Sequence, residues 1–95
     1  MRQIKPTTQF KKDHKREQKG LHKQKVQGSN CKLMSVVQLL ACDELLPPKY
    51  HDHQLTGTYA DCRDCHIAPD LILIYQLVGK DALLLIRLGS HSELF

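Results

Sequence analysis

Hydrophobic residues in the first half of the chain follow a helical spacing. Between residues 33 and 40 they recur at intervals of three and four positions, the period of a helix with one buried face. A loop with a capping residue, residues 28–30, precedes this segment, and Pro47-Pro48 follows it. Because the residue before a proline avoids the helical conformation, we expect this core helix to end at about Leu46.

The second half carries two continuous apolar runs, residues 71–78 and 82–88. The short segment between them, Gly79-Lys80-Asp81, is a hairpin signal. A more polar stretch, residues 61–67, precedes a tight turn at residues 68–70 that leads into the first apolar run. This order predicts a three-stranded antiparallel meander.

The predicted fold class is α+β. Two N-terminal helices would pack on a small twisted antiparallel sheet of three to four strands, the fourth being a short edge strand at residues 3–5. A chain of 95 residues has the length of one domain, residues 1–95. An apolar share of 41% is ordinary for a packed protein and excludes wholesale disorder.

Positive charge is concentrated at the front of the chain. Residues 1–32 hold ten Lys and Arg against two acids, whereas residues 33–95 hold four against eight. A helix beginning near Thr7 or Thr8 would place six basic residues in a sector of about 140°, with Phe10, His14 and Leu21 on the opposite side. The six are Lys11, Lys12, Lys15, Arg16, Lys19 and Lys23. The pattern favours a polyanionic partner, nucleic acid first, and a solvated basic tail is the alternative.

Two classes of protein are excluded. No apolar run approaches the roughly 20 residues that span a bilayer, so we expect no membrane association. The first twenty residues carry seven basic side chains and no apolar signal segment. We therefore expect a cytoplasmic protein whose four cysteines stay free thiols.

The two turns set the expected strand pairing. The turn at residues 79–81 places Arg87 opposite Leu73, and the turn at residues 68–70 places His66 opposite Leu71. On this register His66 and Arg87 share a face with His91, which lies just beyond the last strand. A slip of one residue in either turn would reverse the faces.

Four polar residues from distant positions thus converge at one end of the predicted sheet: His66, Asp70, Arg87 and His91. Two imidazoles, a carboxylate and a guanidinium can perform acid–base chemistry on a phosphate. The guanidinium can hold two phosphate oxygens and offset charge in the transition state. No metal is required when the nucleophile is a ribose 2′-hydroxyl.

The sequence Cys62-Arg63-Asp64-Cys65-His66 also fits the attachment pattern of c-type haem. Haem attachment requires export, and no signal segment is present. A zinc site lacks a second close cysteine pair, and strand residues three apart point to opposite faces. We therefore expect neither metal nor haem.

Three segments carry a more specific signal: residues 49–57 (KYHDHQLTG), 62–75 (CRDCHIAPDLILIY) and 87–95 (RLGSHSELF). In this order they closely resemble the YafQ branch of the RelE superfamily, bacterial toxins of type II toxin–antitoxin modules. The match runs from about Leu45 to the end of the chain. The first 30 residues match more loosely, through residues 10–13 and the basic helix that follows. The resemblance implies a RelE-like fold.

The resemblance also implies an mRNA endonuclease that acts in the ribosomal decoding site by attack of the 2′-hydroxyl on the adjacent phosphate, without a cofactor. Six residues match functional positions of the family: His53, His66, Asp70, Arg87, His91 and Phe95. The resemblance makes His91 the leading candidate for the general acid, Arg87 for a phosphate clamp and Phe95 for stacking on a nucleobase. The base stays open among His53, His66 and Asp70.

Partners follow from the same resemblance: mRNA, the ribosome through its RNA, and a cognate antitoxin, with operator DNA bound only by the toxin–antitoxin complex. The basic face of the first helix suits ribosomal RNA, and an acidic antitoxin segment would suit it too. One position departs from the family, because Leu71 stands where Trp is usual, which would remove a stacking surface. The alternative is a non-catalytic RNA- or ribosome-binding domain of the same fold.

Overall fold

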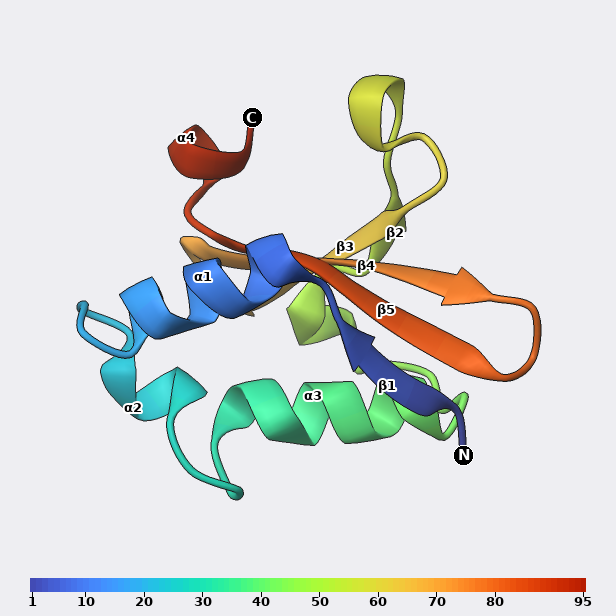
Figure 1. The fold of residues 1–95 in the computed structure, drawn as a ribbon, viewed down its shortest axis with the longest axis horizontal. Helices are drawn as coiled ribbons and strands as arrows, with labels where there is room; N and C mark the ends of the chain where they lie inside the picture. The colour runs from blue at the N-terminus through green and yellow to red at the C-terminus, as the bar shows by residue number, and fades with distance from the viewer.

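The computed structural model describes residues 1–95 and builds them around one twisted sheet (Figure 1). Its elements are β1 (Gln3–Pro6), α1 (Thr8–Glu17), α2 (Lys23–Val26), α3 (Lys32–Ala41), the 3-10 turn η1 (Pro48–Tyr50), β2 (His53–Gln54), the 3-10 turn η2 (Gly57–Tyr59), β3 (Arg63–Ala68), β4 (Leu71–Val78), β5 (Ala82–Gly89) and α4 (His91–Leu94). Figure 1 shows α3 on one side of the sheet and α4 with η2 on the other. None of the helices is long and apolar enough to cross a membrane.

The sheet confirms the predicted meander and extends it. The strand order is β1-β5-β4-β3-β2, with β3, β4 and β5 antiparallel as expected. The expectation of three to four antiparallel strands is wrong in two respects. The two-residue strand β2 adds a fifth strand, and β1 pairs with β5 in parallel, so the sheet is mixed. A short strand that covers the open edge of β5 can run in either direction, and sequence pattern does not decide which.

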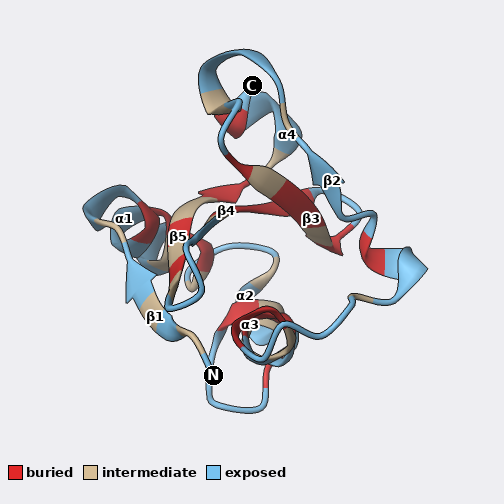
Figure 2. Ribbon diagram, turned by 90° about the vertical axis from the view of Figure 1, so that its right-hand side faces the viewer, coloured by how far each residue is buried: buried red, intermediate tan, exposed pale blue.

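Strand β4 is buried on both faces, which explains its continuous apolar run. Leu71, Leu73 and Tyr75 belong to the main core with α3. Ile72 and Ile74 belong to a smaller cluster on the other face. Figure 2 shows β4 buried along most of its length. The protein therefore has two apolar layers, one on each side of β4.

Helix α3 supplies the predicted core residues, Leu33, Val36, Val37 and Leu40. It ends at Ala41, five residues earlier than expected, and Asp43 adopts a left-handed backbone. Residues 28–30 provide no side-chain cap, since Cys31 is the N-cap and makes no capping hydrogen bond. The prolines therefore limit the helix without defining its last turn.

Helix α1 begins as predicted, with the Oγ1 of Thr7 accepting a hydrogen bond of 3.1 Å from the amide of Phe10. It ends at Glu17, before Gly20, and Lys23 starts a separate helix. The predicted basic face is thus interrupted, and two short helices and α3 precede the meander in place of two helices. Leu21, expected beside Phe10, is fully exposed in the connecting turn.

Both strand pairings differ by one residue from the predicted register at the site. His66 pairs with Ile72, not Leu71, because the turn is tighter than predicted and pairs Ala68 with Leu71; a bulge between His66 and Ala68 then sets the pairing of His66. Arg87 pairs with Ile74, not Leu73, because the β4–β5 register shifts between Ile74 and Tyr75. Since both slips are by one residue, His66 and Arg87 still share a face, but it is the Ile72 and Ile74 face.

Candidate active site

One row of side chains crosses four strands of the sheet. His53 of β2 pairs with Asp64 of β3, Asp64 with Ile74 of β4, and Ile74 with Arg87 of β5. Directly paired residues project to the same face. His66 lies two positions beyond Asp64 on β3 and joins them on that face. We refer to His53, Asp64, His66 and Arg87, which are candidates for the chemistry of the site, as the catalytic row.

Helix α4 is fixed over this face by its cap and its packing. The hydroxyl of Ser90 accepts a hydrogen bond from the amide of Glu93, and the Glu93 carboxylate accepts one from the amide of Ser90. Leu94 packs in the cluster that contains Ile72 and Ile74. A helix of only four residues is thereby held in one orientation.

This orientation brings His91 and Phe95 together at the end of the chain. Their ring centroids lie 5.0 Å apart, and Tyr59 of η2 meets Phe95 edge-on at 6.0 Å. Phe95 nevertheless stays 53% exposed, which is unusual for a large apolar side chain with two aromatic neighbours. An exposed, supported aromatic ring is suited to stacking on a nucleotide base.

Asp70, one of the candidates for the general base, contacts the backbone of α4. Its Oδ1 accepts a hydrogen bond of 3.2 Å from the backbone amide of His91. A carboxylate at a helix N-terminus is favoured by the orphan amides and the helix dipole. Asp70 therefore ties the β3–β4 turn to the first turn of α4 and so positions His91.

The segment that leads into β2, residues 51–53, carries two histidines and is anchored by the acid between them. Asp52 accepts hydrogen bonds from the hydroxyl of Tyr75, at 2.5 Å, and from the guanidinium of Arg63, at 3.3 Å. Burial and the contact with Asp52 raise the pKa of the Tyr75 phenol, so it remains a donor. With this anchor, the rings of His51 and His66 lie 5.4 Å apart.

Asp64 is a candidate site residue that our reading of the sequence missed. It is 2% exposed, and its Oδ1 lies 3.0 Å from Nδ1 of His53. That nitrogen is directed at the carbonyl of His51, 2.9 Å away, so Oδ1 accepts no hydrogen bond. Burial raises the pKa of Asp64, while His53, His66 and His91 act in the opposite direction. Its position two residues before His66 on a strand is the signal that would have identified it.

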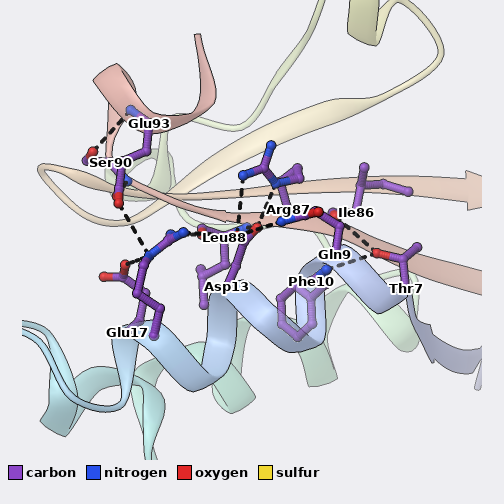
Figure 3. Close-up of polar contacts among 11 residues, drawn as sticks. Thr7, Gln9, Phe10, Asp13, Glu17, Ile86, Arg87, Leu88, Ser90 and Glu93 are labelled. Carbon is purple, nitrogen blue, oxygen red and sulfur yellow. Dashed lines mark hydrogen bonds and ion pairs between the residues drawn. The ribbon is translucent and has the colours of Figure 1, made fainter.

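Helix α1 positions the guanidinium of Arg87 through Asp13. Its Nε donates to Oδ2 of Asp13 at 2.7 Å, and its Nη2 to Oδ1 at 3.3 Å. The amide of Leu88 donates to Oδ2 as well, at 3.1 Å (Figure 3). Burial would raise the pKa of Asp13, but the hydrogen bonds from Arg87, Leu88 and Gln9 outweigh it and lower that pKa. The Arg87 side chain remains 22% exposed.

A second arginine connects α1 with α4. Arg16 contacts Asp13 at 3.1 Å, Glu17 at 3.0 Å and Glu93 at 3.3 Å, and donates to the carbonyl of Leu88 at 2.9 Å. A side chain at Gly89 would meet Arg16, because a Cβ there lies 2.8 Å from Nη2. The helix that was predicted to bind a polyanion therefore also supports two parts of the site.

The predicted basic residues thus divide into two groups. Lys11, Lys12, Lys15, Lys19 and Lys23 are exposed and form no ion pair within the chain. Arg16 is committed to the internal network described above. Leu71, where the resemblance led us to expect Trp, is fully buried in the main core and presents no surface to a ligand.

No group of three or more His, Cys, Asp or Glu side chains is arranged to hold an ion. Cys62 and Cys65 belong to the two different apolar clusters, on opposite sides of the sheet. What the site does hold is proton donors and acceptors around a guanidinium.

Comparison with known proteins places this arrangement in a family. The model of the family described as the bacterial toxin YafQ of a type II toxin–antitoxin system matches residues 2–95. An mRNA interferase toxin YafQ from Escherichia coli K12 is 41% identical, over 99% of this chain and 96% of the relative.

Solved structures agree. YafQ in the E. coli DinJ–YafQ complex is 38% identical, with a TM-score of 0.81 over 100% of this chain and 99% of that one. A copper-bound mutant toxin from Helicobacter pylori is also 38% identical, with a TM-score of 0.85 over 100% of both chains. A family match along nearly the whole chain, joined to relatives at this identity, means that the chain belongs to the YafQ family of type II toxin–antitoxin toxins.

Proposed function

We propose that this protein is the toxin of a type II toxin–antitoxin module and cleaves mRNA on the ribosome. The observation that carries the proposal is the catalytic row, with α4, its His91 and the adjoining Phe95 packed on the same side of the sheet. The E. coli relative is called an mRNA interferase, which supports the same activity here. With the ribosome as its target, the toxin would act in the cytoplasm.

The reaction is a transfer of the phosphate within the RNA. A base removes the proton of a ribose 2′-hydroxyl, whose oxygen attacks the adjacent phosphorus, while an acid protonates the departing 5′-oxygen. The products are a 2′,3′-cyclic phosphate and a free 5′-hydroxyl. The reaction is complete without a metal ion.

We assign the acid to His91, on the first turn of α4. Arg87 holds the scissile phosphate, because Asp13 orients its guanidinium and leaves part of the side chain exposed. The base is one of the two histidines that flank Asp64, His53 or His66, since Asp70 is engaged with the amide of His91. Phe95 stacks on a nucleobase of the RNA next to the cleaved bond.

Two partners are part of the proposal. The E. coli relative was solved in complex with DinJ, which supports a cognate antitoxin for this chain, with operator DNA bound through that complex. The exposed lysines of α1 and the following turn would lie along ribosomal RNA, where phosphate contacts give affinity that falls with salt.

The test is cleavage of a defined mRNA on programmed ribosomes. We expect wild-type protein to cut in the presence of EDTA, and His91→Gln and Arg87→Ala to lose about 100-fold or more in rate. Because the H. pylori relative was solved with copper, one arm adds Cu²⁺, which should not be needed. Lys80→Gln, on the β4–β5 turn, is the control. Tight ribosome binding without any cut would instead identify a non-catalytic binder.

A further inference from the structure

A basic pocket of about 650 Å³ opens beside the catalytic row. His53 and His66 line it, and three lysines from separate elements complete the wall: Lys25 of α2, Lys32 of α3 and Lys49 of η1. Helices α2 and α3 lie side by side (Figure 1), and each contributes one lysine to the pocket wall. The pocket has the volume of a small-ligand site, and no acidic residue lines it.

The three lysines are not compensated within the protein. None of them forms an ion pair with a carboxylate of the chain. The ammonium groups of Lys32 and Lys49 lie 5.9 and 5.2 Å from the ring centroid of Tyr50, which is 8% exposed. Two cations that converge on one buried ring, without a counter-ion, are placed for an anionic ligand.

We propose that this pocket binds the sugar–phosphate backbone of the mRNA on the 5′ side of the scissile bond. The inference rests on the function proposed above. His53 and His66 border both the pocket and the catalytic row, so a polymer that lies in the row continues into the pocket. This continuity favours RNA over an acidic peptide.

The direction of the strand follows from the positions of the base and the acid. His91, which faces the departing 5′-oxygen, does not line the pocket, whereas both candidate bases do. The nucleotide whose 2′-hydroxyl attacks therefore lies on the pocket side. The phosphate that the lysines contact is the one that precedes it.

The experiment pairs a charge removed from the protein with a charge removed from the RNA. Ribosomes are programmed with mRNAs that carry one methylphosphonate linkage, 5′ or 3′ of the scissile phosphate. Wild type is compared with Lys32→Gln/Lys49→Gln and with the control Lys5→Gln/Lys80→Gln, which removes two exposed charges outside the pocket. Toxin binding and single-turnover cleavage are both measured.

For wild type and the control, we expect the 5′ methylphosphonate to raise the half-saturating toxin concentration about tenfold. In Lys32→Gln/Lys49→Gln the same linkage should change it less than twofold, because the contact is already lost. The rate at saturation should stay within about threefold, since these lysines bind without taking part in the chemistry. The 3′ linkage should affect all three proteins alike.

Equal sensitivity of all three proteins to the 5′ linkage would overturn the proposal. So would a pocket variant that binds mRNA normally and loses affinity for its antitoxin, because the pocket would then receive an acidic peptide. If wild type cuts no RNA, the proposed function fails. Binding of the toxin to ribosomes programmed with the same mRNAs then still decides whether the subsite exists.

Discussion

The substitution Asp13→Asn tests whether α1 supports the site. Asp13 is fully buried and accepts hydrogen bonds from Arg87, Arg16, Leu88 and Gln9. Asparagine removes the charge and turns an amide nitrogen toward some of these donors. Breaking a buried ion pair costs about 3–5 kcal/mol. The side chains of Arg87 and Arg16 are 22% and 41% exposed and can rehydrate, so we expect about 2–3 kcal/mol.

The assay is urea unfolding at pH 7, with the thermal midpoint as a second measure. A loss of this size lowers the midpoint by about 10–20 °C in a domain of this length. Well below that midpoint, cleavage should still be about 10- to 100-fold slower, because Arg87 is no longer oriented. Asp81→Asn, on the exposed β4–β5 turn, is the control and should change stability by less than about 0.5 kcal/mol.

The stability difference also has a defined pH dependence. The folded-state pKa of Asp13 is lowered, so its ionised form contributes stability that is complete above the unfolded value of about 3.9. The difference between wild type and Asp13→Asn should therefore be constant near neutral pH and shrink as the pH falls through the folded-state pKa. If Asp13→Asn lowers the free energy of unfolding by less than about 0.5 kcal/mol at pH 7 and leaves the cleavage rate unchanged, the role assigned to Asp13 is refuted.

Substitutions at three further positions probe other parts of the site. Burial raises the pKa of Asp64, so ionisation of this residue costs stability above pH 4; Asp64→Asn should raise the thermal midpoint at pH 7 but not at pH 3.5, and should slow cleavage. A slower enzyme without that gain at pH 7 would contradict this. Phe95→Ala should slow cleavage about tenfold with little change in stability, because the ring is 53% exposed, and Phe95→Trp should restore the rate; equal rates for both variants would argue against stacking. Gly89→Ala should cost about 1–3 kcal/mol by displacing Arg16, and an unchanged unfolding midpoint would show that Arg16 moves aside freely.

The sequence predicted those parts of the fold that local patterns specify. The apolar runs identified β4 and β5, and Thr7 identified the start of α1, because caps, turns and periodicity act over a few residues. The bulges near His66 and Ile74 were not predictable from turn length, since an extra residue in one strand leaves the apolar pattern intact.

The candidate site was predictable to a similar extent. Three of the six residues that the resemblance indicated lie on strands that the row crosses. The other three lie in the β3–β4 turn, in α4 and directly after α4. The supporting acids were not found, because Asp13 meets Arg87 across 74 positions of sequence and Asp64 looked like an ordinary polar strand residue. Contacts of that sequence separation are specified by tertiary packing.

The central claim is that the RNA's own 2′-hydroxyl is the nucleophile in the catalytic row. The most direct measurement is cleavage on ribosomes programmed with an mRNA in which the nucleotide 5′ of the cut is 2′-deoxy, beside the all-ribose mRNA. The account predicts that wild type cuts the all-ribose mRNA to leave a 2′,3′-cyclic phosphate and a 5′-hydroxyl, and leaves the 2′-deoxy position intact. Cleavage at the 2′-deoxy position at an undiminished rate would contradict it, because water or a protein side chain would then be the nucleophile.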